Sequence, residues 1–309
     1  MIATRPLVSL VIPAYRSQET VAGCLAALRG QSFRSFETLI VDSSPDDATE
    51  RIVTTGFAEV RYDHAAGRLL PHAARNRGVA AARGDLLVFT DPDVYARPDW
   101  LERLLDAHHR SGPIVVGAVA CHGRRRRDLG IHLCKFAPWL PGGPPRVVDN
   151  APTVNLLCAR SVFESVGPFP DGVMAGDTAW SWRARQRGFA LAFAPDAVVE
   201  HHHLETIGAF LRERHRRGLS FAAMRGAERR LSRRDDLALL VASVLPVRLA
   251  RALALTVRHA ARSGRLADLA TTWPLVLAGH AMSLLGEART HARRLAEPRP
   301  RAGGPADAA

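Results

Sequence analysis

The fold assignment depends on the stretch Asp85-Leu86-Leu87-Val88-Phe89-Thr90-Asp91-Pro92-Asp93. Residues 86–90 have the length and apolar composition of a buried strand, and turn-forming residues bound them on both sides. Open α/β sheets bind ligands at the carboxyl ends of their strands, where Asp91 and Asp93 are expected to lie. Two carboxylates one residue apart can hold a hard divalent cation, which in turn can neutralise a diphosphate. The alternative is an Asp-Pro turn that only closes the strand.

Strand-like and helix-like segments alternate on the N-terminal side of this stretch. Apolar runs at 7–12 and 38–41 predict strands, and residues 18–30 and 72–82 have helical spacing. This order predicts an α/β fold with a mostly parallel central sheet flanked by helices. The turn after the first strand, residues 13–17, contains no glycine, which argues against a dinucleotide-binding fingerprint.

Residues 121–150 interrupt the alternation. They contain four consecutive arginines and a segment rich in proline and glycine. We expect a long loop here, and such loops in compact domains are commonly functional. The segments predicted after it are a strand at 155–159, helices at 161–166 and 178–187, and a strand at 190–194.

Positive charge is concentrated in the C-terminal third. The net charge is +12, and from His201 onward the chain has 19 arginines and 9 acidic residues. Apolar helical segments accompany these arginines, which favours an anionic membrane surface over nucleic acid as the partner. One basic stripe is predicted on a helix, formed by Arg248, Arg251, Arg258 and Arg262.

Residues 269–286 contain no Asp, Glu, Lys or Arg. A membrane span needs about 20 apolar residues, so an interfacial or re-entrant helix pair is expected here, with an ordinary helical subdomain as the alternative. We therefore expect a catalytic domain at 1–204, an Arg-rich helical C-terminal extension at 205–296 that is membrane-associated, and a disordered tail at 297–309.

The cysteines and the N-terminus indicate the compartment. Four widely spaced cysteines without a Cys-x-x-Cys pair suit a reducing environment. The first residues lack the features of a signal peptide. We expect a cytoplasmic protein that is peripheral at the inner face of the cell membrane.

A series of ordered blocks runs between Val8 and His203. They are Val8-Ser9-Leu10-Val11-Ile12-Pro13-Ala14-Tyr15, Phe36-Glu37-Thr38-Leu39-Ile40-Val41-Asp42, Ala73-Ala74-Arg75-Asn76-Arg77-Gly78, Asp91-Pro92-Asp93, Gly176-Asp177-Thr178-Ala179-Trp180-Ser181-Trp182-Arg183 and Pro195-Asp196-Ala197-Val198-Val199-Glu200-His201. In this order and spacing the blocks resemble the family 2 glycosyltransferases, which share a nucleotide-sugar-binding fold of the GT-A type. The resemblance implies inverting transfer of a sugar from a UDP-, dTDP- or GDP-sugar to a hydroxyl of a carbohydrate or lipid-linked acceptor, in cell-envelope, polysaccharide or glycolipid synthesis.

The resemblance also implies roles in donor binding. Asp42 would recognise the base, and Arg75 would lie near the diphosphate, which a guanidinium binds well. Asp93 would bind Mg²⁺ or Mn²⁺ directly, Asp91 would contact the ribose or the cation, and His201, with His203 as the second choice, would turn toward the metal. The nucleoside pocket would also include Pro13, Ala14 and Tyr15.

Asp177 corresponds to the catalytic base of the family, although Gly176 stands where an acidic residue usually precedes it. From the residues alone, Asp177 would be a helix N-cap. Trp180 and Trp182, together with the 121–150 loop, are expected to bind the acceptor, because aromatic faces stack on sugars; the alternative is that both are core residues.

Two other functions fit parts of this pattern. A nucleotidyltransferase of similar fold usually carries a Gly-rich basic loop after the first strand, and residues 14–17 do not supply one. A non-catalytic nucleotide-sugar or nucleic-acid binding protein would not need the intact set Asp91, Asp93 and Asp177.

Overall fold

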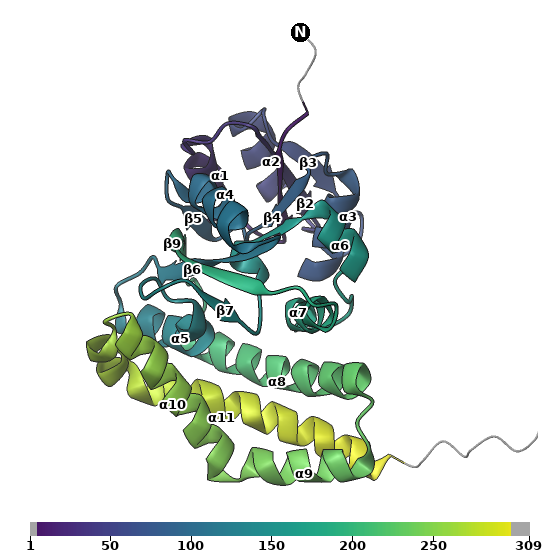
Figure 1. Ribbon diagram of the computed structural model, residues 1–309, viewed down its shortest axis with the longest axis vertical. Helices are drawn as coiled ribbons and strands as arrows, with labels where there is room; N and C mark the ends of the chain where they lie inside the picture. The colour runs from purple at the N-terminus through teal and green to yellow at the C-terminus, as the bar shows by residue number, and fades with distance from the viewer. Residues whose placement is uncertain (1–4, 298–309) are drawn as a thin grey trace, which may run out of the picture.

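The computed structural model describes residues 5–297, and it places an α/β body against a bundle of helices (Figure 1). The segments 1–4 and 298–309, which include nearly all of the expected disordered tail, lie outside the described residues. The predicted alternation is confirmed in the first half of the chain. Its elements are β1 (Val8–Ala14), α1 (Val21–Arg29), β2 (Phe36–Asp42), α2 (Ala48–Gly56), β3 (Arg61–His64), α3 (Pro71–Ala81) and β4 (Leu86–Phe89).

The region 121–150 is structured, which corrects the expectation of a long loop. It contains a helix, α5, whose apolar side chains pack inward because helices of the bundle cover them. The elements after β4 are β5 (Val94–Ala96), α4 (Trp100–Ser111), β6 (Ile114–Cys121), α5 (Arg126–Phe136), the 3-10 turn η1 (Ala137–Trp139), β7 (Arg146–Val148), the 3-10 turn η2 (Thr153–Asn155), β8 (Leu156–Ala159), α6 (Arg160–Val166), α7 (Gly176–Gln186) and β9 (Leu191–His201).

One sheet organises the α/β body, with strand order β3-β2-β1-β4-β8-β6-β9-β5 and β7 paired to β9. Strands β3, β2, β1 and β4 are parallel to one another, and so are β6 and β9. Strand β8 runs antiparallel between β4 and β6, so the sheet is mixed rather than mostly parallel. The direction of β8 depends on the path of the long connection before it, and the spacing of apolar residues does not reveal that path. The carboxyl ends of β1, β2 and β4 nevertheless meet at one edge.

Helices cover both faces of the sheet, which confirms the α/β fold. Side chains of α1, α2 and α4 pack on one face, around Trp100 and Leu104. Side chains of α6 and α7, with Val79 of α3, pack on the other, around Phe163 and Trp180. Strand β1 is buried along its whole length because it lies inside the sheet between both layers. The turn before β4 passes so close to β1 that a Cβ on Gly84 would lie 2.6 Å from the backbone nitrogen of Ser9.

Four helices form the C-terminal extension: α8 (Ile207–Arg229), α9 (Arg233–Val244), α10 (Pro246–Arg262) and α11 (Leu266–Ala296). Helix α8 runs along the α/β body, between α7 and α11 (Figure 1). Two glycines bring α8 and α11 into backbone contact: a Cβ on Gly218 would lie 2.0 Å from the carbonyl oxygen of Ser283, and one on Gly286 would lie 2.2 Å from that of His215. The extension is therefore packed tightly on the body through α8.

Helix α11 is long and apolar enough to cross a membrane by length and composition, and 28% of its apolar window is buried within the protein. Helices α9 and α10 form a pair that bends by 66°. Because α11 packs against α5, α8, α9 and α10, it is a central helix of the bundle.

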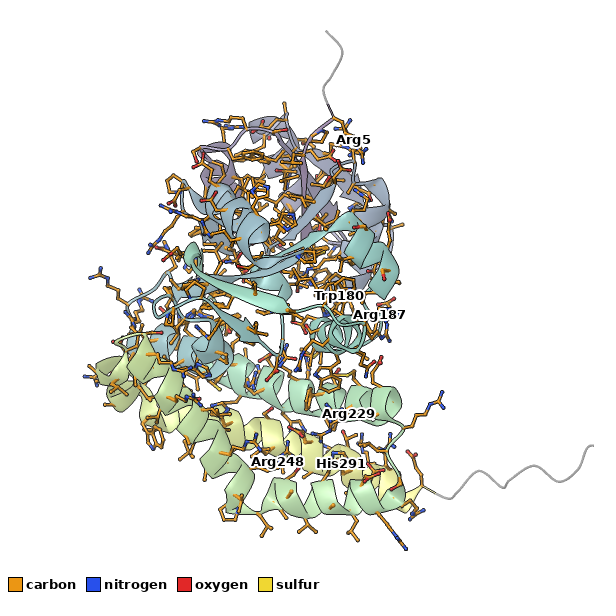
Figure 2. The ribbon with its side chains drawn as sticks, in the orientation of Figure 1. Arg5, Trp180, Arg187, Arg229, Arg248 and His291 are labelled. Atoms are coloured by element: carbon orange, nitrogen blue, oxygen red, sulfur yellow. The ribbon has the colours of Figure 1, made fainter. Side chains whose placement is uncertain are left out.

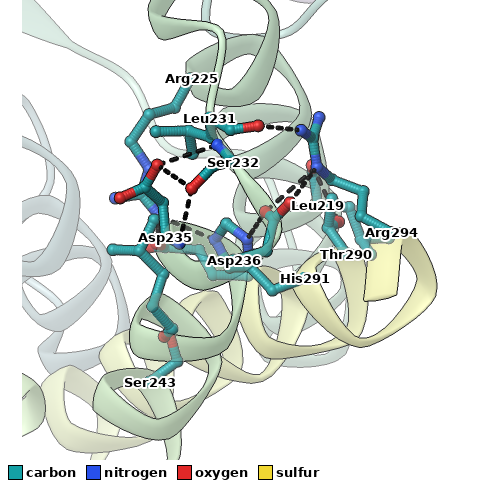
Figure 3. Close-up of polar contacts among 12 residues, drawn as sticks. Leu219, Arg225, Leu231, Ser232, Asp235, Asp236, Ser243, Thr290, His291 and Arg294 are labelled. Atoms are coloured by element: carbon teal, nitrogen blue, oxygen red, sulfur yellow. Dashed lines mark hydrogen bonds and ion pairs between the residues drawn. The ribbon is translucent and has the colours of Figure 1, made fainter. Parts of the chain in front are cut away.

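A buried polar network ties α8, α9 and α11 together (Figures 2 and 3). Asp236 accepts hydrogen bonds from His291 Nδ1 at 2.8 Å and from Arg294 Nε at 3.0 Å. Arg225 donates to Glu287 at 3.0 Å and contacts Nε2 of His291 at 2.9 Å. A buried charge costs free energy unless it is paired and hydrogen-bonded, and each group here has a partner.

The Asp236→Asn substitution removes the charge that His291 and Arg294 face, while it keeps the shape of the side chain. We expect it to lower the free energy of unfolding by about 3 kcal/mol, because His291 and the half-buried Arg294 lose the counter-charge that both of them face. Denaturant unfolding of the full chain measures this. Asp235→Asn is the matched control, since Asp235 is exposed and Asn still accepts the capping bonds of Ser232. Equal destabilisation by both changes would contradict the assigned role of Asp236.

Candidate active site

A cleft of about 960 Å³ lies at the carboxyl edge of the sheet, closed on its other side by the first turns of α8. The ends of β1, β4 and β9 and the start of α7 all contribute to it. Most of the predicted site residues meet there, although they are up to 188 positions apart between Pro13 and His201. Those that line it are Pro13, Ala14, Tyr15, Arg75, Asp91, Asp93, Asp177 and His201.

Asp91, Asp93 and His201 form a compact group in this cleft. One ligand atom from each residue lies within 4.8 Å of the others, and His201 Nε2 is 3.6 Å from Asp93 Oδ2. Burial and the neighbouring Asp91 carboxylate raise the pKa of Asp93 to about 7. Burial, followed by repulsion from His203 and Lys135, holds the pKa of His201 well below its usual value, so this imidazole is neutral at pH 7.

These three side chains fit a divalent cation. Asp93 Oδ1 and His201 Nδ1 are buried polar atoms without a hydrogen-bond partner among the described residues. Two crowded carboxylates and a neutral imidazole are donors that Mn²⁺ and Mg²⁺ accept. A bound cation would remove the repulsion between the two carboxylates.

Arg75 of α3 lies behind this group and pairs with Asp91 Oδ1. Its side chain is only 4% exposed, and its Nε has no hydrogen-bond partner among the described residues. The Arg75 guanidinium therefore neutralises the Asp91 carboxylate, and its Nε–H is still an unused hydrogen-bond donor in the lining of the cleft.

The predicted nucleoside pocket is only partly open. Tyr15 lies at the cleft with the guanidinium of Arg68 stacked 4.5 Å from its ring centre. Asp42 lies behind the wall and is fully buried. Its carboxylate accepts bonds from the Ser44 backbone nitrogen at 2.9 Å and from the Tyr62 hydroxyl at 2.6 Å. Base recognition by Asp42 would require these neighbours to move, and it stays a prediction.

Asp177 stands in the first turn of α7 and faces the cleft. Its backbone N–H donates to His72 Nε2 at 3.3 Å, which anchors this turn to α3. Burial lowers the pKa of His72 to about 4, so the ring is neutral and its Nε2 can accept. The Asp177 carboxylate accepts from the Thr178 backbone nitrogen at 2.8 Å and lies 3.9 Å from Nη2 of Arg217.

The two tryptophans expected to bind the acceptor do not line the cleft. Trp180 is fully buried among the core side chains (Figure 2), and its Nε1 donates to the Gly167 carbonyl at 3.0 Å. Trp182 packs on Phe221 of α8 and under the guanidinium of Arg229. Both are packing residues, because the faces of α7 that carry them are covered by the sheet and by α8. This corrects the acceptor-binding expectation for Trp180 and Trp182.

The cleft also contains side chains that the sequence reasoning did not single out, although three of them lie in the 121–150 region expected to bind the acceptor. Phe136, at the end of α5, and Trp139, at the end of η1, line the cleft and provide the aromatic surface that α7 does not. Lys135 also lines it and pairs with Glu205 at 3.0 Å. Four arginines of α8 lie on the opposite wall; their clustering was visible in the sequence but was assigned to a membrane surface. These are Arg212, Arg214, Arg216 and Arg217.

His203 belongs to a second group of side chains behind His201. Its Nε2 hydrogen-bonds to Nδ1 of His132 at 3.1 Å, and its ring stacks on His201 at 4.5 Å between centres. The Cys121 sulfur lies within 4.8 Å of a ring nitrogen of His132 and of one of His203. His203 therefore supports the His201 ring from behind and does not line the cleft.

Comparison with known proteins identifies relatives of this chain. The model of glycosyl transferase family 2 matches residues 9–153. Glycosyltransferase AglE of Haloferax volcanii is 30% identical over 225 residues, which cover 71% of this chain and 74% of AglE. A pre-mycofactocin glycosyltransferase of Mycobacterium tuberculosis is 29% identical over 212 residues, 63% of this chain and 43% of that relative.

A solved structure shows that the fold is also shared. The mannosyltransferase PcManGT from Pyrobaculum calidifontis, in complex with GDP-Man and Mn²⁺, superposes with a TM-score of 0.58 at 21% identity. The similarity covers 95% of this chain and 88% of that one, so it includes the helical extension. With the family model and the identity along most of AglE, it follows that this chain belongs to the family 2 glycosyltransferases and is an enzyme of that class with the GT-A fold.

Proposed function

We propose that the enzyme transfers a sugar, with inversion, from a nucleoside-diphosphate donor to an acceptor hydroxyl, and that a divalent cation assists. The observation that carries this proposal is the convergence of Asp91, Asp93, His201, Arg75 and Asp177 on one cleft. The neighbour that binds GDP-Man and Mn²⁺ supports a nucleotide-sugar donor of this type and a metal. Donors to be considered are UDP-, dTDP- and GDP-sugars.

The chemistry is a direct displacement at the anomeric carbon. The acceptor oxygen forms a bond to that carbon, its proton passes to the Asp177 carboxylate, and the bond to the diphosphate oxygen breaks. The leaving nucleoside diphosphate takes the electron pair, and Arg75 can stabilise its charge. A cation held by Asp91, Asp93 and His201 would act as a Lewis acid for the diphosphate oxygens. One base and one metal suffice for this displacement, which suits inversion better than a covalent intermediate.

The two parts of the chain would divide the work. Residues 1–204 supply the donor, metal and base groups, and residues 205–296 supply the opposite wall of the cleft through α8. The bend between α9 and α10 exposes three apolar side chains: Val244 by 69%, Leu245 by 47% and Val247 by 68%.

We propose that this bend, with exposed arginines of α10, rests on the anionic inner face of the cell membrane, and that the acceptor belongs to cell-envelope, polysaccharide or glycolipid synthesis. The basic stripe is smaller than expected, because Arg248 pairs with Glu287 inside the bundle at 2.8 Å. The four cysteines are free, which suits a cytoplasmic location.

The Asp177→Asn substitution tests the base. We expect transfer to fall by about 100-fold or more, because the amide cannot accept the proton, while donor binding stays within a factor of about two. Transfer and nucleotide binding are measured separately. Asp171→Asn, an exposed change in the preceding loop, is the control and should leave both unchanged. Transfer by Asp177→Asn at a near wild-type rate would refute the assignment.

The metal hypothesis is tested by chelation and by Asp93→Asn. A nucleoside diphosphate that binds only the native state raises the thermal unfolding temperature. If its binding requires the cation, a chelator should abolish this stabilisation and added Mn²⁺ should restore it. Asp93→Asn should weaken Mn²⁺ binding at least about tenfold through loss of a charged ligand. Asp196→Asn, exposed on β9, serves as the control. Chelator-resistant nucleotide binding with unchanged Mn²⁺ affinity in Asp93→Asn would exclude this cation site.

Membrane association is tested by co-sedimentation of the full chain with phosphatidylglycerol vesicles. Val244→Ser/Leu245→Ser/Val247→Ser should reduce binding at least about tenfold, since three apolar contacts are lost. Added salt should reduce the wild-type signal through screening of the arginines. Val147→Ser, which removes an equally exposed apolar residue from the α/β body, should have no effect. Equal binding by the triple variant and the wild type would rule out docking through this bend.

A further inference from the structure

The α8 wall of the cleft carries positive charge that the rest of the protein does not neutralise. Arg212 and Arg216 are exposed cleft residues one helical turn apart, and neither forms an ion pair with a carboxylate in the described part of the chain. Arg217 reaches a carboxylate only at 3.9 Å, that of Asp177. Glu213 shares this wall, so the cluster of Arg212, Arg216 and Arg217 keeps an excess of two positive charges over it.

The cleft as a whole has more cations than the donor requires. Its lining includes eight arginine or lysine side chains and five carboxylates, an excess of three positive charges. A nucleoside-diphosphate sugar carries about two negative charges, which the divalent cation can balance. The α8 cluster therefore remains uncompensated by the donor and suits a second anionic group.

The position of the cluster assigns it to the acceptor rather than the donor. Arg217 lies beside Asp177, the proposed base, and the attacking hydroxyl must approach that carboxylate. The groups that face the donor diphosphate, Arg75 and Asp91, project from α3 and from the end of β4. The α8 cluster therefore borders the space through which the acceptor enters.

Apolar side chains border the same space. Met174, from the loop before α7, and Leu204, from the loop before α8, line the cleft and are 36% and 47% exposed. The Met174 backbone N–H donates to the Ser220 hydroxyl of α8 at 2.8 Å, which holds this loop against the helix that carries the arginines. Cationic and apolar surfaces thus adjoin at the mouth of the cleft.

We propose that the acceptor is phosphorylated, and that Arg212, Arg216 and Arg217 bind its phosphate while Met174 and Leu204 contact its apolar part. A phosphate brings about two negative charges at neutral pH and matches guanidinium groups in bidentate geometry. This inference rests on the proposed glycosyl transfer and adds the chemical class of the acceptor. The phosphate belongs either to a lipid or to a soluble molecule.

The test uses the full chain with a nucleoside diphosphate and Mn²⁺ already bound at the proposed donor site. The nucleoside diphosphate that binds best is added to saturation with Mn²⁺, and farnesyl phosphate, farnesol and inorganic phosphate are then titrated calorimetrically. Farnesyl phosphate should bind at least about tenfold more tightly than farnesol, because only the former supplies charge to the cluster. The double variant R212Q/R216Q should lose at least about tenfold in affinity for farnesyl phosphate. R234Q removes an exposed arginine of α9 outside the cleft and should bind like the wild type.

The outcomes separate the inference from the function on which it rests. Farnesyl phosphate bound more tightly than inorganic phosphate indicates a lipid-linked acceptor, whereas equal affinities indicate a soluble phosphorylated one; both support a phosphate site. Equal affinity for farnesol and farnesyl phosphate, or unchanged affinity in R212Q/R216Q, overturns the inference while nucleotide binding leaves the proposed transfer intact. If no nucleoside diphosphate binds in the presence of Mn²⁺, the proposed function fails and the inference falls with it.

Discussion

Repulsion between Asp91 and Asp93 is the constraint around which the cleft is arranged. The proline between them stiffens the turn at the end of a buried strand, and both carboxylates are only partly exposed there, Asp91 by 26% and Asp93 by 34%. Burial and this repulsion raise the pKa of Asp93, while a buried guanidinium, that of Arg75, pairs with Asp91. The neutral ring of His201 adds a nitrogen that could bind a metal, and it adds no charge. Such an arrangement is stable when a cation and an anionic ligand arrive together, as a diphosphate and its metal do.

Helix α8 makes the extension part of the cleft rather than an appendage. The sheet edge supplies the wall with the proposed donor-binding groups, and α8 supplies the wall that faces it. The backbone contacts at Gly218 and Gly286 fix α8 on α11, and α11 packs in turn on α5. Because α5 carries Lys135 and Phe136 and leads directly to Trp139, both walls of the cleft depend on the same helix packing. Any larger side chain at Gly218 would therefore act on the cleft as well as on the bundle.

Sequence reasoning located the groups that lie at the ends of strands and the starts of helices. Asp91 follows an apolar run, so the rule that strand ends meet at a sheet edge was enough to place it, whereas His201 was assigned from the family resemblance. It did not locate His72, because its contact with the Asp177 turn joins residues 105 positions apart. It misplaced Trp180, since the spacing within α7 does not tell which face packs on the sheet. It missed α5 and the antiparallel direction of the strand predicted at 155–159, because packing on distant helices and strands decides both.

The arginines of the extension show why composition alone could not assign their function. Arg225 is buried and paired with Glu287, so it stabilises the bundle. Arg251 is exposed on α10, beside the apolar bend. Arg216 is also exposed, but it lines the cleft that holds the proposed base and the proposed metal ligands. The three have the same charge and all lie on helices of the extension, and they differ in burial and in their partners. A guanidinium that finds a carboxylate inside the protein contributes to folding, whereas one that finds none remains available for an anion from outside.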